Sequence, residues 1–280
     1  MLKCSNWNSN WLEHGNQWER NDGKIDYRCG VCGIKRKPWD VKSEDYQWEA
    51  NRKIDELKSY IKYVEYKNIL VVGDLHLPFT LEGYLEFCKS VYYKYNCDHV
   101  IFMGDVIDNH FSSFHATDPD GMGAGDELDL VLEMIQEWAK VFPKADVCHG
   151  NHDLIQLRKA YKEGISKRWI KDFGEVLGVN WNFQPSFEYN NCLFRHGMNM
   201  KAAPKSGSEM MNVIQGHFHT EAYITWLVGR GNKVFGMQVP CGIDRESYAM
   251  AYAKEFPKPA IGCAVLLESG RLPIIEMMDL

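Results

Sequence analysis

The stretch from His99 to Asp108 constrains the fold of this chain more than any other. It joins an apolar run, His99 to Met103, to Gly104, Asp105 and Asp108. A short apolar run that ends at a glycine predicts a buried strand, and the turn that glycine permits directs the next carboxylate beyond the edge of the sheet. The stretch therefore predicts a strand that delivers two carboxylates from its carboxyl end.

The same arrangement, an apolar run followed by residues of metal-ligand type, occurs four more times. The apolar runs span residues 69–72, 145–149, 192–195 and 213–215. The residues that follow them are Asp74, His76, Asn151, His152, Asp153, His196, His217 and His219. Because ligands in open α/β sheets bind beyond the carboxyl ends of the strands, we expect all five strand ends to converge on one site.

Strand-like and helix-like segments alternate around the first of these runs. Apolar runs at 69–72, 99–103 and 145–149 alternate with amphipathic stretches at 81–95 and 126–142. Such alternation predicts a mainly parallel sheet with helices on its faces. Beyond Trp181 one strand follows another, at 187–189, 192–195, 223–228, 233–239, 261–267 and 274–277.

The ligand-type residues together suit transition metals. Carboxylates and one amide oxygen accompany four histidines, His76, His196, His217 and His219. This mixture is typical of sites for Mn, Fe, Zn or Ni, whereas calcium sites are nearly all oxygen. The donors are too many for one ion. Two ions about 3.5–4 Å apart that share one carboxylate would use them all and would hold the attacking and leaving oxygens of an in-line displacement at phosphorus. The pattern therefore predicts hydrolysis of a phosphate ester.

The ordered motifs Asp74-x-His76, Gly104-Asp105-x-x-Asp108, Gly150-Asn151-His152-Asp153, His196 and Gly216-His217-x-His219 resemble those of the calcineurin-like metallophosphoesterase superfamily. The resemblance covers residues 68–280 and implies a four-layer α/β/β/α sandwich, in which the strand-rich second half forms the opposing sheet.

Within that superfamily the chain is similar to phosphoesterases common in phage and prophage genomes. Three features carry this similarity: the insert at 113–129, Arg158 after the Gly-Asn-His-acid block, and the tail from Cys241 through Tyr248 to Gly262. The similarity implies a cytoplasmic enzyme, located in the host cytoplasm if a phage encodes it.

The resemblance also implies a role for each motif residue. One metal ion would be held by Asp74, His76, Asp105 and His219. The other would be held by Asp105, Asn151, His196 and His217, so that Asp105 bridges the two ions. Manganese is the favoured metal, and the nucleophile would be a hydroxide between the ions.

His152 follows a proposed ligand but would not itself bind metal. It would protonate the leaving oxygen or stabilise the developing charge, while Asp108 would orient and charge it. Asp153 stands where many relatives have Glu and would support the loop.

Several residues near the motifs are candidates for substrate contact, and some of them have a structural alternative. Asn109 stands where the protein-phosphatase branch has an Arg that grips a terminal phosphate, which favours diesters over phosphoproteins. The candidates for substrate contact are Asn109, His110, His115, Arg158 and Arg195. The alternative readings are a plain loop histidine for His115, an exposed strand residue for Arg195, and a solvated basic helix face for Arg158 and the lysines after it.

The segment 1–42 differs in kind from the rest. Its Cys29-x-x-Cys32-Gly motif is typical of a zinc knuckle, and Cys4 and His14 are the nearby candidates to complete a zinc-ribbon-like site. A segment so short and polar can hardly form a stable core without a bound metal ion. The alternative is a chance Cys-x-x-Cys in a loose tail.

Residues 43–67 predict a linker helix that begins at Ser43 and carries apolar residues three and four positions apart. The helix could join two subunits as a short coiled coil, but packing on the phosphoesterase domain at 68–280 is the favoured interpretation.

Composition sets the outer limits. A chain of 280 residues with 45% apolar and 25% charged residues is typical of a soluble globular protein. No run approaches the roughly 18 apolar residues of a membrane span, so no membrane partner is expected. Nine cysteines, several within apolar strands, suit a reducing cytoplasm.

The net charge of -6 is unevenly distributed. Residues 1–67 contain 13 Lys/Arg and 11 Asp/Glu, which leaves 19 and 27 for residues 68–280. Four acids of the larger part belong to the predicted site, where two divalent ions would offset them. The acidity therefore argues only weakly against a nucleic-acid substrate.

These patterns favour a two-metal phosphodiesterase or nuclease that acts on DNA, RNA or nucleotides. One alternative is a phosphomonoesterase on small phosphoesters. The other is a DNA-binding or assembly module whose metal site is vestigial.

Overall fold

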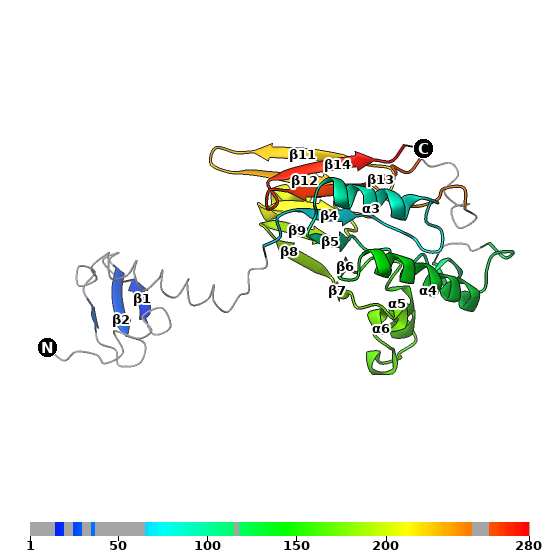
Figure 1. The fold of residues 1–280 in the computed structure, drawn as a ribbon. Helices are drawn as coiled ribbons and strands as arrows, with labels where there is room; N and C mark the ends of the chain where they lie inside the picture. The colour runs from blue at the N-terminus through cyan, green and yellow to red at the C-terminus, as the bar shows by residue number, and fades with distance from the viewer. Residues whose placement is uncertain are drawn as a thin grey trace. The chain divides into compact units, whose positions relative to one another are not determined.

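The computed structural model describes residues 15–19, 25–29, 35–36, 65–114, 118–247 and 258–279. The chain forms two compact units, Met1–Tyr63 and Val64–Leu280 (Figure 1). Within the described parts of the chain, no helix combines the length and the apolar character that a bilayer crossing requires.

The first unit contains a three-stranded antiparallel sheet of β1 (Gly15–Glu19), β2 (Ile25–Cys29) and β3 (Lys35–Arg36). Strand β2 lies in the middle and ends at Cys29. The other predicted zinc ligands, Cys4, His14 and Cys32, lie outside the described residues, as does the predicted linker helix up to residue 64. The zinc site and the helix stay predictions.

A six-stranded sheet with the order β14-β13-β4-β5-β6-β7 forms one half of the second unit. Its parallel part consists of β4 (Ile69–Val72), β5 (His99–Phe102), β6 (Asp146–Cys148) and β7 (Asn182–Gln184). Two antiparallel strands, β13 (Gly262–Leu267) and β14 (Leu272–Met277), extend the sheet beyond β4.

The second sheet has five strands in the order β11-β12-β10-β9-β8. Its central strands β9 (Cys192–Arg195), β10 (Asn212–Gln215) and β12 (Lys233–Gln238) are parallel. Strands β8 (Ser186–Tyr189) and β11 (Tyr223–Val228) pair antiparallel at its two edges.

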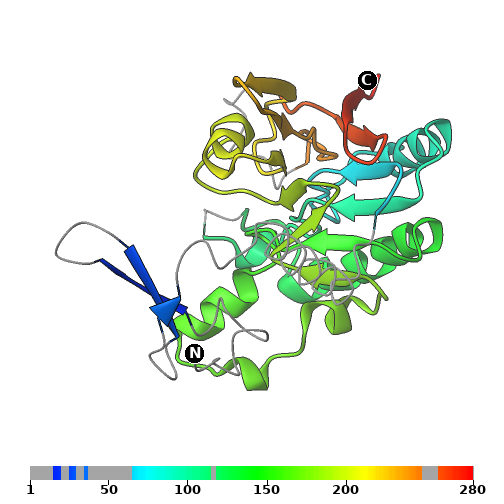
Figure 2. The same ribbon diagram turned by 90° about the vertical axis from the view of Figure 1, so that its left-hand side faces the viewer.

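Helices complete the layers. They are α3 (Tyr84–Lys94), α4 (Ala124–Val141), α5 (Ile155–Lys162), α6 (Phe173–Leu177) and α7 (Ala202–Glu209), with 3-10 turns η3 (His110–Ser112) and η4 (Lys167–Trp169). In both ribbon views, α3 and α4 lie along the six-stranded sheet (Figures 1 and 2). Helix α7 packs against β10, β11 and β12 of the five-stranded sheet.

Alternation along the strands divides the core in two. Leu70 of β4 and Phe102 of β5 face the helices and pack with Trp138 of α4. Ile69 of β4 and Ile101 of β5 face the other way and join the second sheet's side chains in a separate cluster. Because successive side chains of a strand point to opposite faces, one sheet can bury both faces. This arrangement confirms the predicted four-layer α/β/β/α sandwich.

Helix α7 was not predicted from the sequence. It carries Pro204 in its first turn and Gly207 in its interior, and a helix interior disfavours both residues. Proline is tolerated there because the first turn lacks intrahelical partners for its N–H groups. Packing against the five-stranded sheet stabilises this helix, which local propensity does not indicate.

Candidate metal centre

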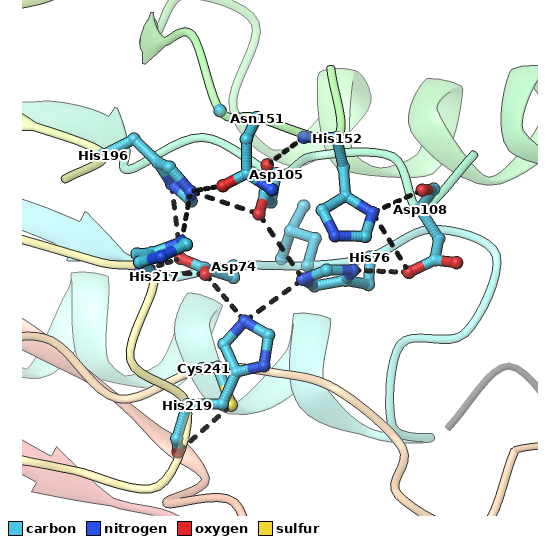
Figure 3. A network of polar contacts seen from close by, with 12 residues as sticks. Asp74, His76, Asp105, Asp108, Asn151, His152, His196, His217, His219 and Cys241 are labelled. Carbon is cyan, nitrogen blue, oxygen red and sulfur yellow. Dashed lines mark hydrogen bonds and ion pairs between the residues drawn. The ribbon is translucent and has the colours of Figure 1, made fainter. Parts of the chain in front are cut away.

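Five turns at the carboxyl ends of β4, β5, β6, β9 and β10 bring their polar side chains together (Figure 3). The first three strands are neighbours in one sheet, and the last two are neighbours in the other. The side chains that these turns deliver are Asp74, His76, Asp105, Asp108, Asn151, His152, His196, His217 and His219. Residues far apart in sequence thus meet where the two sheets face each other.

Three of the converging residues have left-handed backbone conformations. The φ angles are 50° at His76, 46° at Asp105 and 76° at His217. Such conformations cost non-glycine residues on the order of 1–3 kcal/mol each and persist only where the surrounding structure enforces them. These backbone conformations lower the stability of the folded state, and they orient the three side chains.

Glycines let the turns approach one another closely. Gly104 has a φ of 95°, and a Cβ on it would lie 2.7 Å from the Gly150 nitrogen. A Cβ on Gly150 would lie 2.1 Å from both the nitrogen and Oδ1 of Asp105. The β5 and β6 turns are therefore in backbone contact directly behind Asp105.

Replacing Gly150 with Ala is expected to displace Asp105 and to lower the stability by about 1–3 kcal/mol, the usual cost of overpacking. Bound metal should fall together with the melting temperature. The matched control is Gly125→Ala in α4, where a Cβ would meet no atom within 4 Å and alanine is the better helix former. Normal metal content in Gly150→Ala would contradict the expectation.

One group of ligand atoms comes from Asp74, His76, Asp105 and His219, all within 4.8 Å of one another. Nε2 of His219 lies 2.9 Å from Oδ2 of Asp74 and 3.2 Å from Nε2 of His76. Nδ1 of His76 lies 2.5 Å from Oδ1 of Asp108. A proton on Nδ1 donated to that carboxylate leaves a lone pair on Nε2, directed at the group.

A second group comes from Asp105, His196 and His217. Nδ1 of His196 donates to the main-chain oxygen of Met103 at 2.9 Å, so Nε2 is the ring nitrogen that faces the group. That Nε2 lies 3.1 Å from Oδ2 of Asp105 and 2.9 Å from Oδ1 of Asn151. Nδ1 of His217 lies 3.2 Å from Nε2 of His196. Asp105 belongs to both groups.

These donor sets fit divalent metal ions. In each group, carboxylate oxygens and imidazole nitrogens lie within 4.8 Å of one another, and a bound cation would relieve the repulsion between their lone pairs. The second nitrogens of His76 and His196 are bound to a carboxylate and to a carbonyl, as in metal-ligating histidines, where this fixes the tautomer. His76, His196, Asp74 and Asp105 are nearly completely buried.

The electrostatics agree with the donor geometry. Burial lowers the pKa of His196, but Asp105 and Asp74 outweigh it and raise that pKa to about 10. Burial raises the pKa of Asp105, yet the charge of and hydrogen bond from His196 bring it well below its usual range. The carboxylates thus create a field that favours positive charge inside the cluster.

Asp108, which the sequence suggests orients and charges His152, contacts two histidines of the site. Its Oδ1 makes the close contact with His76, while Nδ1 of His152 is 3.7 Å from Oδ1 and 2.6 Å from the main-chain oxygen of Asp108. The carboxylate therefore orients His76, and the peptide carbonyl orients His152. Burial lowers the pKa of His152, but the charges of Asp105 and Asp108 outweigh it and raise that pKa.

Asp153 joins the two turns. Its carboxylate accepts from the main-chain nitrogens of Val106, Ile107 and Gly150 at 2.9, 3.2 and 2.8 Å. Burial and the nearby Asp105 raise the pKa of Asp153 to about 7 against the effect of these amides. This placement matches the supporting role suggested by the sequence.

Glu127 is a supporting residue that the sequence analysis missed. It lies buried in α4 and accepts from the main-chain nitrogens of His110 and Phe111 at 2.8 and 3.1 Å, which holds η3 beside the site. Burial raises its pKa, although these amides oppose the change. An acidic residue within the helix's buried stripe with Val131 and Ile135 was the available signal.

The predicted substrate contacts fall into different surroundings. Asn109 lies beside the site, and its Nδ2 donates to the main-chain oxygen of His152 at 2.9 Å. His110 is only 5% exposed and its Nε2 accepts from the Asp118 nitrogen, which favours a structural role over the predicted contact. Arg158 is exposed on α5, Arg195 is half-buried at the end of β9, and His115 lies outside the described residues.

A family model described as Calcineurin-like phosphoesterase matches residues 67–222, a span that contains all five turns of the site. No curated protein matches the sequence.

Several solved structures are similar in fold. Vacuolar protein sorting 29 from Cryptosporidium parvum is 11% identical, with 77% of this chain and 98% of that chain covered and a TM-score of 0.40. YfcE, a phosphoesterase from E. coli, is 13% identical, with 71% and 87% covered and a TM-score of 0.36. Nuclease MPE from Pseudomonas putida is 15% identical, with 74% and 87% covered and a TM-score of 0.35.

Proposed function

Because this chain belongs to the calcineurin-like phosphoesterase family, we propose that it is a two-metal phosphodiesterase that hydrolyses nucleic acid or nucleotides. One observation carries the proposal. Two buried groups of carboxylate and imidazole donors share Asp105, with His152 beside them. A centre of this kind suits in-line displacement at phosphorus.

The residues of this chain would divide the work as follows. One ion would be held by Asp74, His76, Asp105 and His219, and the other by Asp105, Asn151, His196 and His217. Bound ions would supply Lewis-acid activation of the phosphoryl group and of water. The buried turns hold the ligands rigidly, so little reorganisation is needed when charge develops on the substrate.

His152 would donate the proton to the leaving oxygen. Nδ1 lies 2.6 Å from the Asp108 carbonyl, so this nitrogen donates to the carbonyl and the ring orientation is held. Nε2 is then the nitrogen that can hand a proton to the leaving group. The main-chain nitrogen of His152 donates to Oδ1 of Asp105 at 2.8 Å, which links the acid to the shared ligand.

The residue that follows Asp108 supports a diester more than a monoester. A terminal phosphate carries more negative charge than a diester and is commonly gripped by Arg. Asn109 occupies the position after Asp108, and its amide is bound to His152 and Gln156. Among the described residues, the ion pairs of the site involve only histidines and aspartates.

For the first unit we propose a zinc ribbon that helps to hold nucleic acid or a protein partner. The Cys29-x-x-Cys32-Gly motif and the position of Cys29 at the end of β2 support this proposal. Pairing of subunits through residues 43–67 is a further proposal, which the elution volume of the full-length chain would test.

The function is tested by the metal content of the full-length chain and by its turnover of bis(p-nitrophenyl) phosphate and p-nitrophenyl phosphate with manganese. We expect two transition ions, with zinc in addition if the ribbon forms. The diester should turn over faster, and EDTA should abolish turnover until manganese is restored. Faster monoester turnover would indicate a phosphomonoesterase. Zinc alone without turnover would indicate a binding module with a vestigial site.

A further inference from the structure

The surface that follows the β6 turn differs in charge from the rest of the second unit. Residues 155–171, which include α5 and η4, contain six Lys/Arg and a single Glu. Residues 68–280 as a whole contain 19 Lys/Arg and 27 Asp/Glu. Positive charge is therefore concentrated beside the catalytic turn of an otherwise acidic unit.

Within the described residues, most of these cations are unpaired. Lys171 forms an ion pair with Glu175 at 3.6 Å. Among the residues that the structure describes, no ion pair involves Arg158, Lys159, Lys162, Lys167 or Arg168. Clustered, unpaired cations repel one another, and a polyanion that binds across them relieves this repulsion and releases counterions.

Exposed aromatic rings lie among these cations. Phe114 is 53% exposed and Trp169 is 85% exposed. The Arg158 guanidinium carbon is 5.0 Å and Lys159 Nζ is 5.6 Å from the centre of the Phe114 ring. Phe114, Arg158, Lys159, Lys162, Arg168 and Trp169 are named here the α5 surface. Rings interleaved with cations are the means by which proteins stack unpaired bases and track a phosphate backbone.

The α5 surface is attached directly to the proposed metal centre. Gln156 of α5 donates to Oδ1 of Asn109 at 3.3 Å and to Oγ of Ser112 at 3.0 Å. Asn109 in turn donates to the main-chain oxygen of His152. The eight residues of α5 rise about 12 Å, long enough to contact more than one phosphate of a strand.

A cavity adds depth to this surface. It has a volume of about 380 Å³ and lies between α4, α5, η4 and α6. Its lining includes the cations Lys167 and Lys171, the carboxylates Asp153 and Asp172, and apolar residues such as Leu157. Its size falls within the roughly 300–1,000 Å³ range of small-molecule pockets.

We propose that the α5 surface is a binding track that leads single-stranded nucleic acid to the metal centre, an inference that rests on the proposed function. The exposed aromatic rings favour a single strand over a duplex as the ligand. In a duplex the base faces are stacked and paired, so only its phosphates could contact this surface. In a single strand the bases can stack on Phe114 and Trp169 while the cations contact the phosphates.

The track is tested by fluorescence anisotropy of labelled oligonucleotides of about 12 nucleotides, within the usual site sizes of single-strand binders. The full-length chain is used in EDTA, which prevents cleavage. Single strands of DNA or RNA should bind more tightly than a DNA duplex. The double variant Phe114→Ala/Trp169→Ala should bind single strands about 10-fold or more weakly. In Lys162→Ala/Arg168→Ala, the slope of log affinity against log salt should shrink by about 1.4.

Two exposed positions on other elements serve as matched controls. Tyr93 on α3 is 65% exposed, and Lys233 on β12 lies 4.6 Å from the Trp226 ring centre. Tyr93→Ala and Lys233→Ala should leave single-strand binding unchanged. All variants should keep the wild-type melting temperature, because the replaced side chains are largely exposed.

Two binding results would overturn the track: equal affinity for single strands and duplex, or unchanged single-strand binding by the aromatic variant. A third result would assign the surface to a second copy of the chain. In that case the wild type would be a dimer, and the aromatic variant would be a monomer. The turnover of bis(p-nitrophenyl) phosphate by the wild type tests the proposed function separately. Turnover without single-strand binding would refute the track alone, and binding without turnover would refute hydrolysis.

Discussion

Asp105→Asn is expected to lower turnover of bis(p-nitrophenyl) phosphate by about 10³-fold or more. Asp105 is the residue shared by both donor groups, so a neutral amide weakens both proposed ion sites at once. A bound metal supplies several kcal/mol of transition-state stabilisation, and each 1.36 kcal/mol corresponds to about tenfold in rate. The metal content of the variant should fall together with its turnover.

The matched control for this prediction is Asp146→Asn. Asp146 is also buried, and it accepts from His99, Asn182 and Tyr189 away from the metal centre. Its replacement should lower the stability but leave the metal content per folded chain unchanged. A variant Asp105→Asn that kept wild-type turnover and two bound ions would refute the two-metal reading of the site.

His152→Ala is expected to lower hydrolysis of a dinucleotide by about 10²–10⁴-fold, the usual contribution of general acid–base catalysis. The loss should be smaller for bis(p-nitrophenyl) phosphate. The p-nitrophenolate ion leaves readily without a proton, whereas the sugar oxygen of a nucleotide needs one. The comparison of the two substrates therefore reports proton donation and not binding.

The structure makes this substitution informative. The contact between His152 and Asp105 comes from the main-chain nitrogen of His152, which an alanine retains. Asp105 should thus stay in place, and the metal content should remain normal. His99→Ala, which removes a histidine that contacts Asp146 instead, serves as the control. Equal losses on both substrates would show that His152 positions the site and does not donate a proton.

The sequence determined the layers of the second unit and the set of residues that converge. Short, continuously apolar runs that alternate with helical segments specify a sheet that buries both faces. The ligand-type residues follow those runs, so strand order alone brings Asp74, Asp105 and Asn151 to one edge of the first sheet, and His196 and His217 to one edge of the second. Local pattern carries this information because each strand and its turn are only a few residues long.

Only the tertiary structure decided which atoms meet. Asp108 binds His76 with its carboxylate and His152 with its carbonyl, a choice between two histidines that no spacing reveals. The left-handed backbone at Asp105 and the hold of Glu127 on η3 also arise from contacts between distant segments. Such contacts depend on how neighbouring turns and helix α4 pack against one another. A single sequence shows the turns one at a time, whereas their packing is a property of the whole fold.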